Sequence, residues 1–182
     1  MSEGLPTPAP DFDQPVAVLK HCHDRIRKQL KTLEQLPGHL REQGVNVDAQ
    51  QAATAVMRYF NQAAGQHHAD EEQDLIPMLQ DTAQGEDAAT LSALLPRILA
   101  EHREMDELWQ KLNAQLQAVA AGSGTALDDG DVQRFCALYG AHMEIEEGNI
   151  APMAKRLFSA SQMSRLGNAM RARRGIPCDG AQ

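Results

Sequence analysis

The sequence has 182 residues, and its 17 Lys and Arg against 25 Asp and Glu give a formal net charge of −8. That length suits one domain with a sizeable hydrophobic core. The acidic balance argues against a nucleic-acid partner, whose phosphates would require a basic face. The longest uninterrupted apolar runs are only a few residues long, so the sequence predicts no membrane-spanning helix.

The N-terminal segment and the cysteines bear on the cellular compartment. Residues 1–12 are rich in proline, lack a signal-peptide pattern and are expected to form a disordered lead. The cysteines, Cys22, Cys136 and Cys178, are odd in number and form no Cys-x-x-Cys pair. This usage is typical of a reducing compartment, so we expect a cytoplasmic protein. Cys178 lies in a polar tail and is expected to be exposed.

Good helix formers dominate the composition, and strand-forming patterns are nearly absent. The first helix is expected to run from about Asp13, a possible N-cap, to Leu36, because Pro37 and Gly38 should stop it. Three more long helices follow, over residues 48–79, from residue 87 or 96 to 121, and over 131–158 with Asp131 as a plausible cap.

Long helices joined by modest loops favour antiparallel neighbours. We therefore predict an all-α, up-down four-helix bundle over residues 13–158. A short extra C-terminal helix and tail should occupy residues 159–182. Ser159 and Gln162 are spaced as a capping box for this helix, and Gly175 should end it.

The second and fourth predicted helices carry a sequence repeat. Residues 67–72 read His-His-Ala-Asp-Glu-Glu, and residues 142–147 read His-Met-Glu-Ile-Glu-Glu. A Pro-Met pair follows each copy at the same distance, at 77–78 and at 152–153. The chain therefore reads as two helical hairpins, each ending in a helix with a His-x-x-x-Glu motif.

The first and third helices each place one histidine on an apolar stripe. His23 and His102 each follow an aliphatic residue by four positions and precede apolar residues by three and seven positions. That spacing directs both imidazoles toward the bundle interior. His21 falls off the stripe, so His23 is the preferred candidate on the first helix.

These positions predict a metal site. Residues i and i+4 share a helix face, so His67 with Glu71 and His142 with Glu146 can each point an imidazole and a carboxylate inward. His23 adds a further imidazole, as does His102 on the third helix. Four imidazoles and two carboxylates in a bundle core are costly to bury unless metal ions compensate them.

The ligand types suggest two metal ions. Four imidazoles and two bridging carboxylates would give eight bonds, whereas two octahedral ions need about twelve. Positions would remain for a bridging oxide or hydroxide and for a small exogenous ligand. Nitrogen and oxygen donors without thiolate suit iron, with manganese second, and a closed tetrahedral zinc site is less natural.

Several neighbouring residues are assigned lesser roles. Glu72 and Glu147 are turned about 140° from their histidines on a helical wheel, so they should support the site or face solvent. His68 is expected to be a supporting or surface residue, and Tyr139 is expected mainly to pack near the site. His39 follows Pro37 and Gly38 in a predicted loop.

The combined motifs resemble the hemerythrin HHE cation-binding domain. The resemblance rests on His23-Asp24, His67-x-x-x-Glu71-Glu72 with Pro77, Glu101-His102, and His142-x-x-x-Glu146-Glu147 with Pro152. It covers about residues 13–158 and implies an up-down bundle with a non-heme di-iron centre. It further implies that His23, His67, His102 and His142 are terminal ligands and that Glu71 and Glu146 bridge the irons.

The resemblance narrows the function without fixing it. Oxygen-carrying hemerythrins have an additional His-x-x-x-His pair, which this sequence lacks. The four-His, two-Glu set is closer to iron-sulfur-cluster repair proteins, but the segment before Asp13 is too short for their usual cysteine-bearing domain. Ferritin and rubrerythrin bundles use Glu-x-x-His pairs, and no histidine here has a glutamate three residues before it.

Three hypotheses follow from the predicted site. The first is a di-iron protein that binds or senses oxygen, nitric oxide or peroxide. The second is a redox enzyme, such as a peroxidase or an oxygen or nitric oxide reductase, which would need an electron-donor protein. The third is a structural or regulatory bundle in which the metal only holds the helices together.

Overall fold

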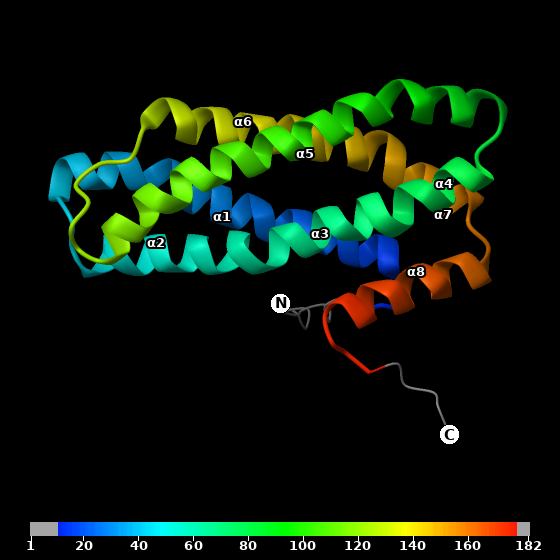
Figure 1. Cartoon of the computed structure of the whole chain (residues 1–182), viewed down its shortest axis with the longest axis horizontal. Coiled ribbons are helices and arrows are strands. Elements are labelled where there is room, and N and C mark those ends of the chain that lie inside the picture. Colours follow the sequence, from blue (N-terminus) through cyan, green and yellow to red (C-terminus); the bar gives the residue numbers. More distant parts are fainter. Residues whose placement is uncertain (1–10, 178–182) are drawn as a thin grey trace, which may run out of the picture.

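The structure is a computed structural model, and it describes residues 11–177. Within this range every regular element is helical, and five rods follow one another along the chain (Figure 1). Four of them form an up-down bundle, and the fifth lies alongside one half of it. The predicted all-α bundle with an extra C-terminal helix is confirmed. Most of the expected N-terminal lead (residues 1–10) and Cys178 lie outside the described residues.

Two of the rods contain wide π-helical turns, and three are uninterrupted α-helices. The uninterrupted helices are α1 (Pro15–Gln43), α5 (Gly85–Ala120) and α8 (Ala160–Arg173). The second rod is composed of α2 (Val47–Tyr59), η1 (Phe60–Ala64), α3 (Gly65–Asp70), η2 (Glu71–Leu75) and α4 (Ile76–Thr82). The fourth rod is composed of α6 (Asp129–Ile145), η3 (Glu146–Ile150) and α7 (Ala151–Leu157). None of the helices between residues 11 and 177 is long and apolar enough to span a membrane.

The predicted end of the first helix is wrong. Helix α1 continues through Pro37 and Gly38 to Gln43, and Gly44 ends it with a φ of 68°. A proline removes one helical hydrogen bond, but burial of an apolar face supplies most of a helix's stability in a protein. Leu40, one turn past the expected stop, is buried in the core. His39 therefore lies in a helix rather than in the predicted loop.

The predicted helix starts are partly right. Gln14, not Asp13, is the N-cap of α1. The N-cap of α6 is Asp128 rather than Asp131, and its carboxylate accepts a hydrogen bond from the Asp131 backbone amide at 2.8 Å. The error arises because several acidic residues precede this helix, and each has the chemistry of a cap. The capping box between Ser159 and Gln162 is present at the start of α8, as predicted.

The core is divided into two apolar clusters. One contains Leu33, Leu112 and Phe135, and the other, toward the α8 end, contains Leu79 and Leu166. Nine polar or charged residues of the described range are also buried, most of them histidines and glutamates. The predicted site residues belong to this buried polar set, so the bundle holds a polar layer in its interior.

Helix α8 is attached to the bundle next to the polar layer. The guanidinium groups of Arg173 and Arg174 both bind Asp70, whose side chain is completely buried, and the Arg174 contact measures 2.7 Å. Arg173 also reaches Asp74 at 2.6 Å. Because a buried carboxylate without partners would be costly, these contacts fix α8 against the second rod.

The N-terminal end of the described chain also packs on α8. A Cβ atom at Gly167 would lie 1.9 Å from the Phe12 carbonyl oxygen, which is too close for any side chain. The aromatic ring of Phe12 lies under the guanidinium groups of Arg171 and Arg174. Glycine at position 167 therefore permits the close backbone contact between this segment and α8.

We expect a Gly167→Ala variant to lose about 1–3 kcal/mol of unfolding free energy, because the added methyl group must displace the Phe12 backbone. Chemical denaturation monitored by circular dichroism measures the change. Gly140→Ala is the matched control, since a Cβ there meets nothing within 4 Å and alanine favours a helix. Equal stability of the two variants would contradict the proposed close contact.

Candidate metal centre

The structure brings all six predicted ligands together inside the bundle, from each of its four rods. They are His23 on α1, His67 on α3, Glu71 at the start of η2, His102 on α5, His142 on α6 and Glu146 at the start of η3. Each is at most 4% exposed. The preference for His23 over His21 agrees with this placement, because His21 is only half-buried and belongs to neither cluster described below.

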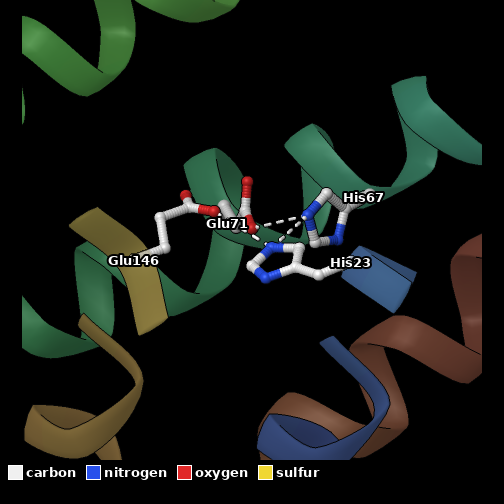
Figure 2. Close-up of side chains that lie close together, drawn as sticks. All are labelled: His23, His67, Glu71 and Glu146. Atoms are coloured by element: carbon white, nitrogen blue, oxygen red, sulfur yellow. Dashed lines mark hydrogen bonds and ion pairs between the residues drawn. The ribbon is translucent and has the colours of Figure 1, made fainter. Parts of the chain in front are cut away.

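The six residues form two groups of four that share both glutamates. One group contains His23 and His67 with Glu71 and Glu146 (Figure 2), and the other contains His102 and His142 with the same glutamates. Within each group, one ligand atom from every residue lies within 4.8 Å of the others. Such spacing is compatible with one cation in each group.

Each glutamate faces both groups through its two oxygens. For Glu71, Oε1 lies 3.1 Å from His67 Nε2 and Oε2 lies 3.5 Å from His102 Nε2. For Glu146, Oε2 lies 3.2 Å from His23 Nε2 and Oε1 lies 3.2 Å from His142 Nε2. This is the arrangement that two bridging carboxylates would require.

The buried oxygens lack ordinary hydrogen-bond donors. Glu71 Oε2 and Glu146 Oε2 accept no hydrogen bond within the described residues, although imidazole nitrogens lie 3.5 and 3.2 Å away. The imidazoles are also crowded, since His23 Nε2 lies 3.0 Å from His67 Nε2. Orphaned carboxylate oxygens and converging imidazole nitrogens fit a bound cation, which would take lone pairs from both.

Carboxylates outside the centre hold three of the four imidazoles by their other ring nitrogen. His102 Nδ1 lies 2.6 Å from Glu72, and His23 Nδ1 lies 3.0 Å from Glu147. Such contacts fix the orientation of a ligating imidazole and raise its basicity. Both glutamates therefore contact histidines of the centre, as one of the two expectations had it, and Glu72 is also exposed to solvent, as the other had it.

The wide turns explain how two adjacent glutamates serve different histidines. η2 begins at Glu71 and η3 begins at Glu146, so each turn starts at a candidate bridging residue. π-helical turns are rare and occur often at functional sites. Here the first glutamate of each pair points into the centre, and the next one reaches a histidine on a neighbouring rod.

The third supporting carboxylate, Glu101, was missed as a functional residue by sequence reasoning. Its Oε2 lies 2.9 Å from His142 Nδ1, and Arg97 holds its Oε1 at 2.6 Å. The repeat aligns Glu101 with Cys22, since each precedes the histidine on its helix. Because Cys22 stands at this position in the other half, no equivalent carboxylate is available there, and His67 Nδ1 has no hydrogen-bond partner among the described residues. The Glu-His pair at 101–102 was the available signal.

The electrostatics of the centre favour a cation. Burial and the neighbouring Glu146 charge raise the pKa of Glu71 well above its usual value. Burial alone would raise the pKa of Glu146 too, but the adjacent imidazoles of His142 and His23 hold it well below its usual value. Burial and the nearby His23 lower the pKa of His67 to about 3. An imidazole that stays uncharged, such as that of His67, is a good ligand for a divalent ion when two carboxylates lie beside it.

His68 and Tyr139 cover one side of the second group. The His68 ring is buried and stacks on His102 with a centroid distance of 4.0 Å and an interplanar angle of 11°. The Tyr139 hydroxyl lies 3.4 Å from His68 Nε2. His68 is therefore a buried supporting residue, not a surface one, and Tyr139 both packs and forms a polar contact.

Comparison with known proteins points to the same kind of site. Residues 14–154 match the hemerythrin HHE cation-binding domain. The chain is also similar to an uncharacterised protein of Haemophilus influenzae, with 27% identity over 165 residues, which cover 91% of this chain and 92% of the relative. The family match spans all six residues of the two groups.

We expect Glu72→Ala and Glu147→Ala each to lower metal affinity by about 10–100-fold, because each removes the carboxylate that orients a histidine. Competition with a chromogenic chelator measures the affinity. Glu144→Ala is the control, since Glu144 is exposed on α6 and its removal changes the net charge equally. Affinities equal to that of this control would show that the Nδ1 contacts do not tune the site.

Proposed function

The chain belongs to the hemerythrin HHE cation-binding family, and we propose that it binds two iron ions at the six-residue centre. His23 and His67 would hold one iron, and His102 and His142 the other. Glu71 and Glu146 would bridge the two ions. The irons would in turn bind a small ligand such as oxygen, nitric oxide or peroxide.

The observation that carries this proposal is the sharing of both glutamates between two four-residue groups. Four imidazoles with two bridging carboxylates supply eight metal bonds, and two octahedral ions require about twelve. The remaining positions can accept small ligands. Nitrogen and oxygen donors with this count suit iron best, with manganese or zinc as alternatives.

Reversible oxygen carriage is not the proposed task. The sequence lacks the additional His-x-x-x-His pair by which oxygen-carrying relatives differ from it. Sensing or handling of a small ligand is compatible with a symmetric set of two imidazoles per iron. Repair of iron-sulfur clusters remains an alternative use of the same ligand set.

Metal loading tests the proposal directly. Anaerobic loading should give two irons per chain by elemental analysis, and oxygen or nitric oxide should then change the optical spectrum. We expect Glu71→Gln to lower the iron content by at least one ion per chain, because an amide bridges two cations poorly. Glu107→Gln, on the exposed face of α5, should bind as much iron as the unaltered chain. Iron below one ion per chain in the unaltered protein would refute the proposal.

A redox enzyme that uses the same irons is the second candidate, and the Tyr139 contact favours it. This hydroxyl reaches His68, whose ring stacks on His102. A protonatable group there could assist reduction of hydrogen peroxide to water, which consumes two electrons and two protons. The electrons would come from a partner protein or, in an assay, from ascorbate.

We expect Tyr139→Phe to slow peroxide reduction while iron content stays unchanged, since phenylalanine keeps the packing and removes only the hydroxyl. Consumption of peroxide with ascorbate as reductant measures the rate. Tyr59→Phe is the matched control, because its hydroxyl donates to the Cys22 carbonyl rather than to His68. Absence of turnover in the unaltered iron-loaded protein would eliminate this candidate.

A further inference from the structure

A pocket leads from the protein surface to one half of the metal centre. It has a volume of about 180 Å³, and its lining includes the buried residues His23, Glu71 and Glu146. Its lining also includes Lys20 and Lys155, which are exposed on α1 and α7. The pocket therefore connects solvent with the group that contains His23 and His67.

The wall of the pocket between its mouth and its floor is mainly apolar. Leu19, Leu75, Ile150 and Ala151 contribute to it. A single water needs a cavity of only about 10–15 Å³, so the space can admit a ligand of a few heavy atoms. An apolar wall offers no competing polar contacts, so a ligand in the pocket would bind at its floor.

The two lysines at the mouth carry free positive charges. Neither Lys20 nor Lys155 forms an ion pair or hydrogen bond among the described residues. Three glutamates share the pocket lining with these lysines. Glu71 and Glu146 belong to the metal centre, and Glu147 is engaged by Arg27 at 2.9 Å and by His23 at 3.0 Å. With cations in the centre to compensate Glu71 and Glu146, the two lysines would make the mouth positively charged and would favour the approach of anions.

The other half of the repeat lacks these features. Ile76 occupies the repeat position of Ala151, and its side chain is buried with 4% exposure. Gln80 occupies the position of Lys155, and Leu99 that of Lys20. The side chain of Ile76 is larger than that of Ala151, and neither lysine has a charged counterpart, so the approach to the other half of the centre differs in both size and charge.

We propose that this pocket is the entrance for the exogenous ligand, and that its lysine-flanked mouth favours small monoanions of the size of azide or nitrite. The ligand would reach the ion held by His23 and His67 rather than the one held by His102 and His142. This inference rests on the proposed function, because it needs metal in the centre. Lys20 and Lys155 act on the approach of the ligand, and Ala151 keeps the passage wide.

Ligand association kinetics test the proposal. The full chain is loaded with iron, and binding of azide, an anion, and of nitric oxide, a neutral molecule, is followed by stopped-flow absorbance. In low salt, the double variant Lys20→Met and Lys155→Met should bind azide about tenfold more slowly, with little change for nitric oxide. Added salt should reduce this difference, because it screens the exposed charges.

A matched variant separates local from overall charge. Lys31→Met with Lys111→Met removes the same charge from exposed positions outside the pocket lining and should leave azide binding unchanged. Ala151→Ile, which copies the residue of the other half, should slow both probes about tenfold or more by narrowing the passage. Iron content and melting temperature verify that each variant is folded and loaded.

The outcomes distinguish this proposal from the proposed function. Iron-loaded unaltered protein that binds neither probe would overturn both. If it binds both probes, equal azide rates in the two lysine variants would overturn the anion preference. Unchanged rates for both probes in a folded, loaded Ala151→Ile variant would overturn the assignment of the pocket as the entrance, while the proposed function would stand.

Discussion

Burial of four imidazoles and two carboxylates between the two apolar clusters is the constraint on which the rest of this structure depends. Polar groups in such a layer are tolerated only when partners or cations compensate their lost hydration. In this chain the compensation is incomplete without a cation, because Glu71 Oε2 and Glu146 Oε2 accept no hydrogen bond within the described part. The surrounding carboxylates and wide turns are arranged around that layer.

The predicted placement of the six side chains agrees with the structure more closely than the predicted helix ends do. The repeated His-x-x-x-Glu spacing and the apolar stripes are local, so they placed six side chains in one layer. The stop at Pro37 failed because Leu33, Leu36 and Leu40 continue one buried face across the proline, which only the packed bundle reveals. Packing of this buried face in the bundle therefore outweighed the helix-breaking tendency of Pro37.

The supporting carboxylates were beyond local reasoning for a different reason. A helical wheel turned Glu72 and Glu147 away from their own histidines, which is correct for an α-helix. Their partners, however, are His102 and His23 on other rods. Glu101 likewise serves His142. Contacts between rods depend on how the bundle packs and on where the wide turns fall. A helical wheel drawn for one regular α-helix shows neither.

The repeat therefore yields two similar ligand sets in dissimilar surroundings. On the half of His102 and His142, both imidazoles have a carboxylate at Nδ1, and the His68 ring stacks against one of them. On the other half, only His23 has such a partner, and His67 Nδ1 has none among the described residues. Carboxylate support raises the basicity of a ligating imidazole. A cation held by His102 and His142 would thus have stronger donors and be more shielded. The less supported half, with His23 and His67, is the one beside the pocket.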